Sequence, residues 1–109
     1  MTEVTIYRNS EDKYIGFESK GHANFRRAGK DIVCAAISIL TVNCANSIEE
    51  IAHVKCDVTE GDGYLKVTVR DFDNDNVQLF IESLKLGLTE IQKDYPKNLK
   101  LTIGGVDHD

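Results

Sequence analysis

The sequence predicts a two-layer α+β sandwich, in which two helices cover one face of a mostly antiparallel sheet. Five short runs alternate between apolar and polar residues, as half-buried strands do. Two longer stretches repeat apolar residues at the helical spacing, and the order along the chain is ββαββαβ. Because each alternating run has one apolar face, we expect the helices to cover one side of the sheet and water to meet the other.

The first hairpin is expected within the first 20 residues. Residues 3–8 read EVTIYR and residues 14–20 read YIGFESK, and both runs alternate. The polar stretch NSED between them supplies a turn. In the second run, Ile15 and Phe17 form the predicted apolar face.

A second hairpin and a last strand complete the predicted sheet. The hairpin is expected within residues 53–69, where EGDG supplies the turn. Its inward positions are Val54, Cys56 and Val58 in one strand and Leu65, Val67 and Val69 in the other. The last strand is expected at residues 98–103, which read NLKLTI.

The second helix is predicted from about residue 76 to residue 94. Its apolar residues follow the helical spacing from Val77 to Ile91. Asn74 or Asp75 is a suitable N-cap, and Pro96 follows where a helix commonly stops. No linker divides the chain, so we predict one domain over residues 1–104 and a disordered tail at 105–109.

The first helix, predicted from Asp31 to about Ala52, is apolar around most of its circumference. Between residues 32 and 42 only Ser38 and Thr41 are polar. A small two-layer domain does not bury one helix on all sides. One explanation is that the second helix leans over it. We favour a homodimer in which this helix packs against its symmetry mate.

The composition favours a reduced, cytoplasmic protein. No apolar run approaches the ~20 residues that span a bilayer, and the N-terminus does not resemble a signal peptide. The three cysteines lack the spacing of zinc ligands, and we expect no metal. The net charge of -5 argues against direct nucleic-acid binding and suits a basic partner.

A histidine lies at the start of the predicted loop at residues 21–30, and a cysteine follows the loop. With Asp31 as N-cap, Cys34 lies in the first turn of the helix, where the helix dipole favours a thiolate. His22 follows the second strand, and a neutral imidazole can accept a proton from a thiol. The plainer interpretation is a packed cysteine and a surface histidine. Cys34, Ser38 and Thr41 share one helix face, which predicts a cleft beside the cysteine.

The same stretch resembles a known family. GHA at residues 21–23 and GKDIVCAAIS at residues 29–38 are similar to the bacterial ribosomal-processing cysteine protease family, Prp. The similarity extends over nearly the whole chain. It implies a small α/β sandwich, often dimeric, that needs no metal or organic cofactor. It further implies a cytoplasmic endopeptidase that removes an N-terminal extension from a large-subunit ribosomal protein.

The resemblance also assigns roles to individual residues. It implies that Cys34 is the nucleophile and His22 the general base, and that Asp31 and Ser38 have supporting roles. Two alternatives stay open. One is a non-catalytic ribosome-assembly module in which Cys34 only packs. The other is a thiol-redox or acyl-transfer enzyme, although Cys44 is poorly spaced to resolve a disulfide with Cys34.

Overall fold

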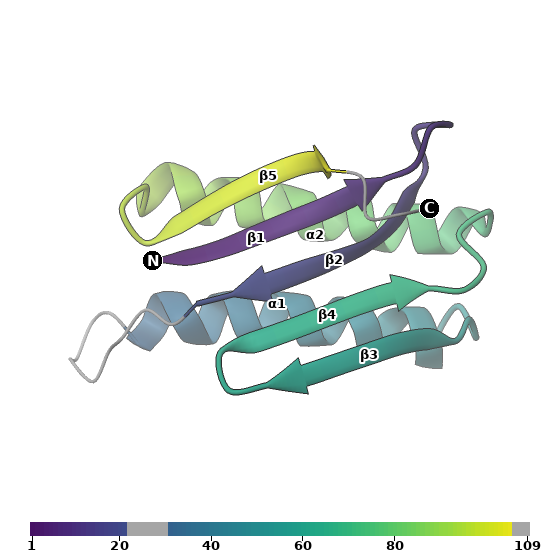
Figure 1. Ribbon diagram of the computed structural model, residues 1–109, viewed down its shortest axis with the longest axis horizontal. Helices are drawn as coiled ribbons and strands as arrows, with labels where there is room; N and C mark the ends of the chain where they lie inside the picture. Colours follow the sequence, from purple (N-terminus) through teal and green to yellow (C-terminus); the bar gives the residue numbers. More distant parts are fainter. Residues whose placement is uncertain (22–30, 106–109) are drawn as a thin grey trace.

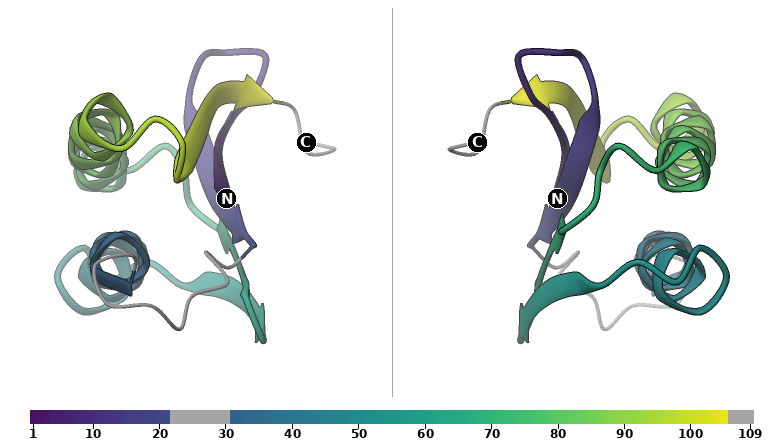
Figure 2. Two further views of the ribbon diagram at one scale, coloured as in Figure 1. Left: turned by 90° about the vertical axis from the view of Figure 1, so that its left-hand side faces the viewer. Right: turned by 90° about the vertical axis from the view of Figure 1, so that its right-hand side faces the viewer.

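Two helices lie against the same face of one five-stranded sheet (Figures 1 and 2). This computed structural model describes residues 1–21 and 31–105. The elements are β1 (Thr2–Arg8), β2 (Tyr14–Lys20), α1 (Asp31–Glu50), β3 (Cys56–Gly61), β4 (Tyr64–Val69), α2 (Asp75–Asp94) and β5 (Leu99–Gly105). The predicted order ββαββαβ and the two-layer α+β class are confirmed.

The sheet has the strand order β3-β4-β2-β1-β5. Three neighbouring pairs are antiparallel, and β1 and β5 are parallel. α1 lies against the half of the sheet that contains β3 and β4, and α2 lies behind β1 and β5 (Figures 1 and 2). The ends of β2 and β3 and the start of α1 therefore meet at one end of the molecule.

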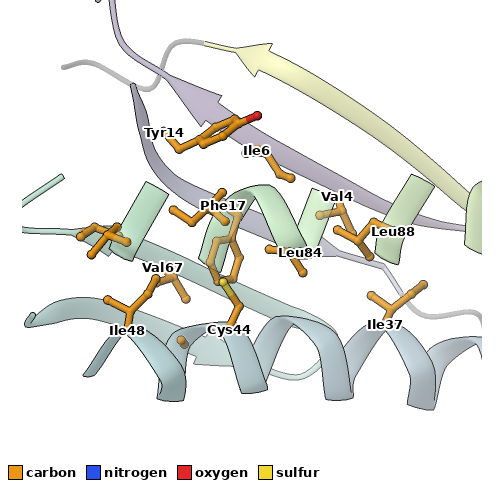
Figure 3. Close-up of a cluster of buried hydrophobic side chains, with 14 of the residues drawn as sticks. Val4, Ile6, Tyr14, Phe17, Ile37, Cys44, Ile48, Val67, Leu84 and Leu88 are labelled. Atoms are coloured by element: carbon orange, nitrogen blue, oxygen red, sulfur yellow. The ribbon is translucent and has the colours of Figure 1, made fainter. Parts of the chain in front are cut away.

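The core fills the space between the sheet and the helices (Figure 3). Its sheet side contains alternate residues of the inner strands, and its helix side contains one stripe of each helix. Members that are almost wholly buried include Val4, Ile6, Phe17, Val67, Ile48, Ile81 and Leu88. Burial of side chains of this size contributes about 1.5–3 kcal/mol each, so this cluster holds the two layers together.

An irregularity in the first hairpin changes one predicted face. The β1–β2 register shifts between Tyr7 and Arg8, and Arg8 pairs with Tyr14. Tyr14 therefore joins the core cluster together with Phe17, whereas the predicted Ile15 is buried outside that cluster. The Tyr14 hydroxyl donates a hydrogen bond to Glu82 Oε1 of α2 at 2.7 Å. A bulge of this kind redirects side chains without a local sequence signal.

The element ends differ from the prediction by a few residues. The Asn74 side chain caps α2 by accepting from the backbone N–H groups of Asn76 and Val77. α1 already begins at Asp31, one position earlier than an N-cap at Asp31 requires, and it ends at Glu50. β5 continues through Gly105, where the tail was predicted to start. The remaining tail and the 22–30 part of the predicted loop lie outside the described residues.

α1 buries one stripe and exposes another. Ile37, Cys44 and Ile48 face the core, whereas Ile32 and Ile39 are 59% and 67% exposed. Contrary to the expectation that no apolar run approaches a bilayer span, Ile32–Glu50 is long and apolar enough to cross a membrane by length and composition alone. Part of this apolar composition is explained by the buried stripe, because a core helix of a small domain also needs apolar residues where it faces the core. The exposed isoleucines are not explained by packing within the described residues.

Candidate active site

A pocket of about 240 Å³ opens where α1 begins and where β2, β3 and β4 meet at the end of the sheet. Cys34, Ser38 and Thr41 of α1 all line it, as the shared helix face predicts. Together with Val42 they form the α1 wall of the pocket. From residue 34 to residue 42 a helix rises about 12 Å, which matches three to four residues of an extended peptide.

Glycines just after β2 and at the β3–β4 turn leave part of the pocket floor without side chains. The Gly21 N–H donates to the Gly63 carbonyl oxygen at 3.0 Å, so these residues lie side by side. The Thr2 hydroxyl donates to the Gly21 carbonyl oxygen at 3.5 Å. Gly21 has φ +98°, a conformation that favours glycine. Its backbone is thus held on both sides at the end of β2, immediately before His22.

A second row of the floor carries side chains. Glu60 pairs with Leu65, Leu65 with Ser19, and Ser19 with Val4. Directly paired residues place their side chains on the same face of a sheet. Val4 is wholly buried in the core, so this whole row faces the helices. Ser19, Leu65 and Glu60 therefore stand opposite α1 in the pocket.

The three cysteines differ in their surroundings. Cys34 is the fourth residue of α1, is half-buried and lines the pocket. Burial raises the pKa of Cys44 to about 12, with a smaller contribution from Cys56. Burial, followed by the charges of Glu49 and Asp57, raises the pKa of Cys56 to about 11. At neutral pH, Cys44 and Cys56 are therefore thiols with little nucleophilic character.

The hydroxyl groups beside Cys34 have different roles. Thr41 is buried, and its hydroxyl donates to the Ile37 carbonyl oxygen at 2.9 Å. The proton of this hydroxyl is therefore used in a hydrogen bond to the helix backbone. Ser38 is exposed one turn beyond Cys34, and its side chain has room to meet a bound molecule.

The structure brings together only part of the predicted site. Cys34 and Ser38 line one pocket. His22 lies outside the described residues, and Asp31 is placed only as the first residue of α1. Sequence reasoning missed Thr2 and Glu60, which reach the pocket through strand pairing over long sequence separations. Within residues 1–21 and 31–105, no group of three His, Cys, Asp or Glu residues is arranged to hold a metal ion.

The chain is similar to known proteases over almost its full length. A family model described as cysteine protease Prp matches residues 1–100. The ribosomal processing cysteine protease Prp of Bacillus subtilis (strain 168) is 31% identical over 108 residues, which cover 94% of this chain and 96% of that protein.

Two crystal structures of the ribosomal processing protease Prp from S. aureus share the fold, each with a TM-score of 0.86. Each comparison covers 94% of this chain and 99% of the other. One structure is a complex with a substrate peptide and is 28% identical in sequence. The other is a complex with a covalently linked product peptide and is 30% identical.

Proposed function

Because the chain belongs to the Prp family of cysteine proteases, we propose that it removes the N-terminal extension of a bacterial large-subunit ribosomal protein. Cys34 supplies the nucleophilic thiolate, and His22 acts as general base and then as general acid. The substrate class rests on the family, since the similar protein of Bacillus subtilis is a ribosomal processing cysteine protease. A ribosomal protein substrate places the reaction in the cytoplasm.

The observation that carries this proposal is the position of Cys34. It lies near the N-terminus of α1 and lines a pocket open to solvent. The backbone N–H groups of a helix N-terminus and its partial positive charge stabilise negative charge that develops there during a reaction. The pocket wall is long enough for a short extended peptide, and a similar protease binds a substrate peptide. Neither Cys44 nor Cys56 lines this pocket.

The chemistry follows from these groups. The Cys34 sulfur attacks the carbonyl carbon of the scissile peptide bond and forms a tetrahedral intermediate. Backbone N–H groups in the first turn of α1 have no helical acceptor, so they are available to bind the oxyanion. The C–N bond then breaks, the thioester remains on Cys34, and the His22 imidazolium gives its proton to the departing amine. Water activated by His22 hydrolyses the thioester and restores the thiol.

The backbone around Gly21 supports the role of His22. Hydrogen bonds from the Thr2 hydroxyl and to the Gly63 carbonyl fix the residue that precedes the histidine. This anchor lies at the same pocket as Cys34. The residue that precedes His22 is therefore fixed at the pocket that Cys34 lines.

Cleavage of a synthetic peptide tests the proposal. The peptide would span the N-terminal extension of the large-subunit ribosomal protein from the same organism, and the products would be weighed by mass spectrometry. We expect cleavage by the wild type, none by Cys34→Ala or His22→Ala, and normal cleavage by the control Cys56→Ala. In the alternative, a non-catalytic ribosome-assembly module, Cys34→Ala would still support growth in place of the wild type. That result would refute the proposal.

We also propose that the protein acts as a homodimer through α1. Ile32 and Ile39 of this helix are 59% and 67% exposed, and Val42, at the edge of the pocket, is 45% exposed. Leu40 instead packs against α2, where its Cδ1 would lie 2.9 Å from a β-carbon at Gly87. Of the neighbouring residues Ile39 and Leu40, Ile39 is therefore the one that is free to contact a second copy. Val42 and Ser38 line both this surface and the pocket, which would couple assembly to the site.

A further inference from the structure

Glu60 carries the one charged side chain among the described residues that line the pocket. It is the fifth residue of β3, at the edge of the sheet. The strand register places its side chain on the same face as Leu65 and Ser19, opposite α1. The carboxylate is thus presented to the space that Cys34 and Ser38 border from the other side.

The Glu60 carboxylate is not engaged by any of the described residues. It forms no ion pair or hydrogen bond with them, and it is exposed. Two other carboxylates of the sheet are occupied. Asp57 of the same strand pairs with Arg70 at 2.7 Å, and Glu18 accepts hydrogen bonds from two tyrosines. Glu60 is therefore available to a ligand in a way that these neighbours are not.

We propose that Glu60 determines specificity by selecting a lysine or arginine side chain of the substrate peptide. The proposal rests on the protease function and deepens it. A basic side chain is amphipathic, and the pocket offers both kinds of surface it needs. Its aliphatic stem packs between Val42 and Leu65, and its charged end reaches Glu60. The selected residue lies within about four residues of the scissile bond, given the length of the α1 wall.

A second role for this charge makes a different prediction. Charged residues on edge strands oppose unwanted pairing with another sheet. In that role Glu60 would affect association of the protein but not the preference among peptides of different charge. The two roles are separated by changing the charge of the peptide.

The test uses the ribosomal N-terminal peptide as a host, with Lys, Gln or Glu placed in turn at each position around the cleavage site. For the wild type we expect one position where kcat/KM for Lys exceeds that for Gln by about two- to fivefold, the size of an exposed ion pair. Glu60→Gln should abolish this preference, and Glu60→Lys should reverse it in favour of Glu. The preference should shrink in 0.5 M salt because the charges are screened.

The matched control is Glu3→Gln. Glu3 lies at the same end of the sheet and pairs with Lys20 on the opposite face, so this variant loses the same charge away from the pocket. It should keep the wild-type preference. Equal preferences in the wild type, Glu60→Gln and Glu3→Gln would overturn the proposal while leaving the protease function intact.

Binding gives an answer that does not depend on cleavage. The same peptides would be titrated calorimetrically into Cys34→Ala and into Cys34→Ala combined with Glu60→Gln. We expect the Lys peptide to bind about two- to fivefold more tightly than the Gln peptide only when Glu60 is present. If the wild type cleaves no peptide, the protease function fails, and this titration still decides whether Glu60 selects basic side chains.

Discussion

The carbonyl oxygen of Met1 lies so close to Gly21 that a β-carbon at Gly21 would be 2.5 Å from it. Gly21 also has φ +98°, which residues with a side chain rarely adopt. A substitution there would meet both a steric clash with backbone and an unfavourable dihedral angle. The first strand therefore constrains the point from which the chain continues to His22.

Gly21→Ala should lower the free energy of unfolding by about 1–3 kcal/mol and reduce peptide cleavage further than this loss explains. The reason is that the residue before the general base must move. The matched control is Gly104→Ala, because Gly104 has nearly the same φ of +97° but does not line the pocket. Urea denaturation and cleavage rates measure both effects. Equal activity of the two variants under fully folded conditions would contradict the prediction.

Iodoacetamide should label Cys34 well before Cys44 and Cys56 in the folded protein at neutral pH. Cys34 lines an open pocket, whereas burial raises the pKa of Cys44 to about 12 and that of Cys56 to about 11. The alkylating reagent reacts with thiolate. Mass spectrometry of tryptic peptides over time measures the order, and urea-unfolded protein is the control in which the difference should vanish. Labelling that starts at Cys56 would count against Cys34 as the nucleophile.

Ile39→Glu should convert the proposed homodimer into a monomer with impaired cleavage. A charge at this exposed position opposes burial against a second α1. Leu86→Glu on α2 is the control, since Leu86 is 69% exposed and Ile39 is 67% exposed. Light scattering over a range of concentrations measures the mass. A wild-type protein that stays monomeric at high micromolar concentration would refute the homodimer.

Glu18 on β2 links stability to pH. Burial raises the pKa of its carboxyl, but hydrogen bonds donated by Tyr64 at 2.5 Å and Tyr7 at 2.7 Å outweigh burial. The charges of Lys20 and Lys66 act in the same direction, and the pKa falls below its ordinary 4.5. A carboxyl with a lowered pKa stabilises the folded state above pH 4.5, and this contribution is lost as the pH falls through the folded-state pKa.

Glu18→Gln should therefore be less stable than the wild type at pH 7 and closer to it at pH 3. Urea denaturation at pH 7, 5 and 3 measures the difference. An exposed carboxyl on α2, changed in Glu90→Gln, is the control and should shift the curves little. A constant gap between Glu18→Gln and the wild type at all three pH values would show that the charge of Glu18 is not the cause.

The local sequence pattern was sufficient to predict the helices and strands and the α1 residues that line the pocket. The helical spacing from Val77 onward and the cap at Asn74 are properties of neighbouring residues, so α2 was predicted closely. The shared face of Cys34 and Ser38 likewise follows from helix geometry. These features need no knowledge of the rest of the chain.

Features set by pairing between distant segments were not predictable in this way. The bulge that turns Tyr14 into the core depends on how β1 and β2 align. Glu60 reaches the pocket only through the register of three strands, and Thr2 reaches it from the start of the chain. A single sequence does not fix such registers, because several alignments satisfy the same alternation.

The parallel pairing of β1 with β5 also has a consequence for synthesis. Thr2, which borders the pocket, pairs with Leu99 near the other end of the chain. Contacts between residues so far apart in sequence form late and slow the folding of small domains. β1 can pair with β2 early, but its parallel pairing must wait, as the chain emerges from the ribosome, until β5 has been translated. A nascent chain truncated before β5 should lack the strand that pairs with Thr2 at the pocket, so peptide cleavage should begin only after β5 is released.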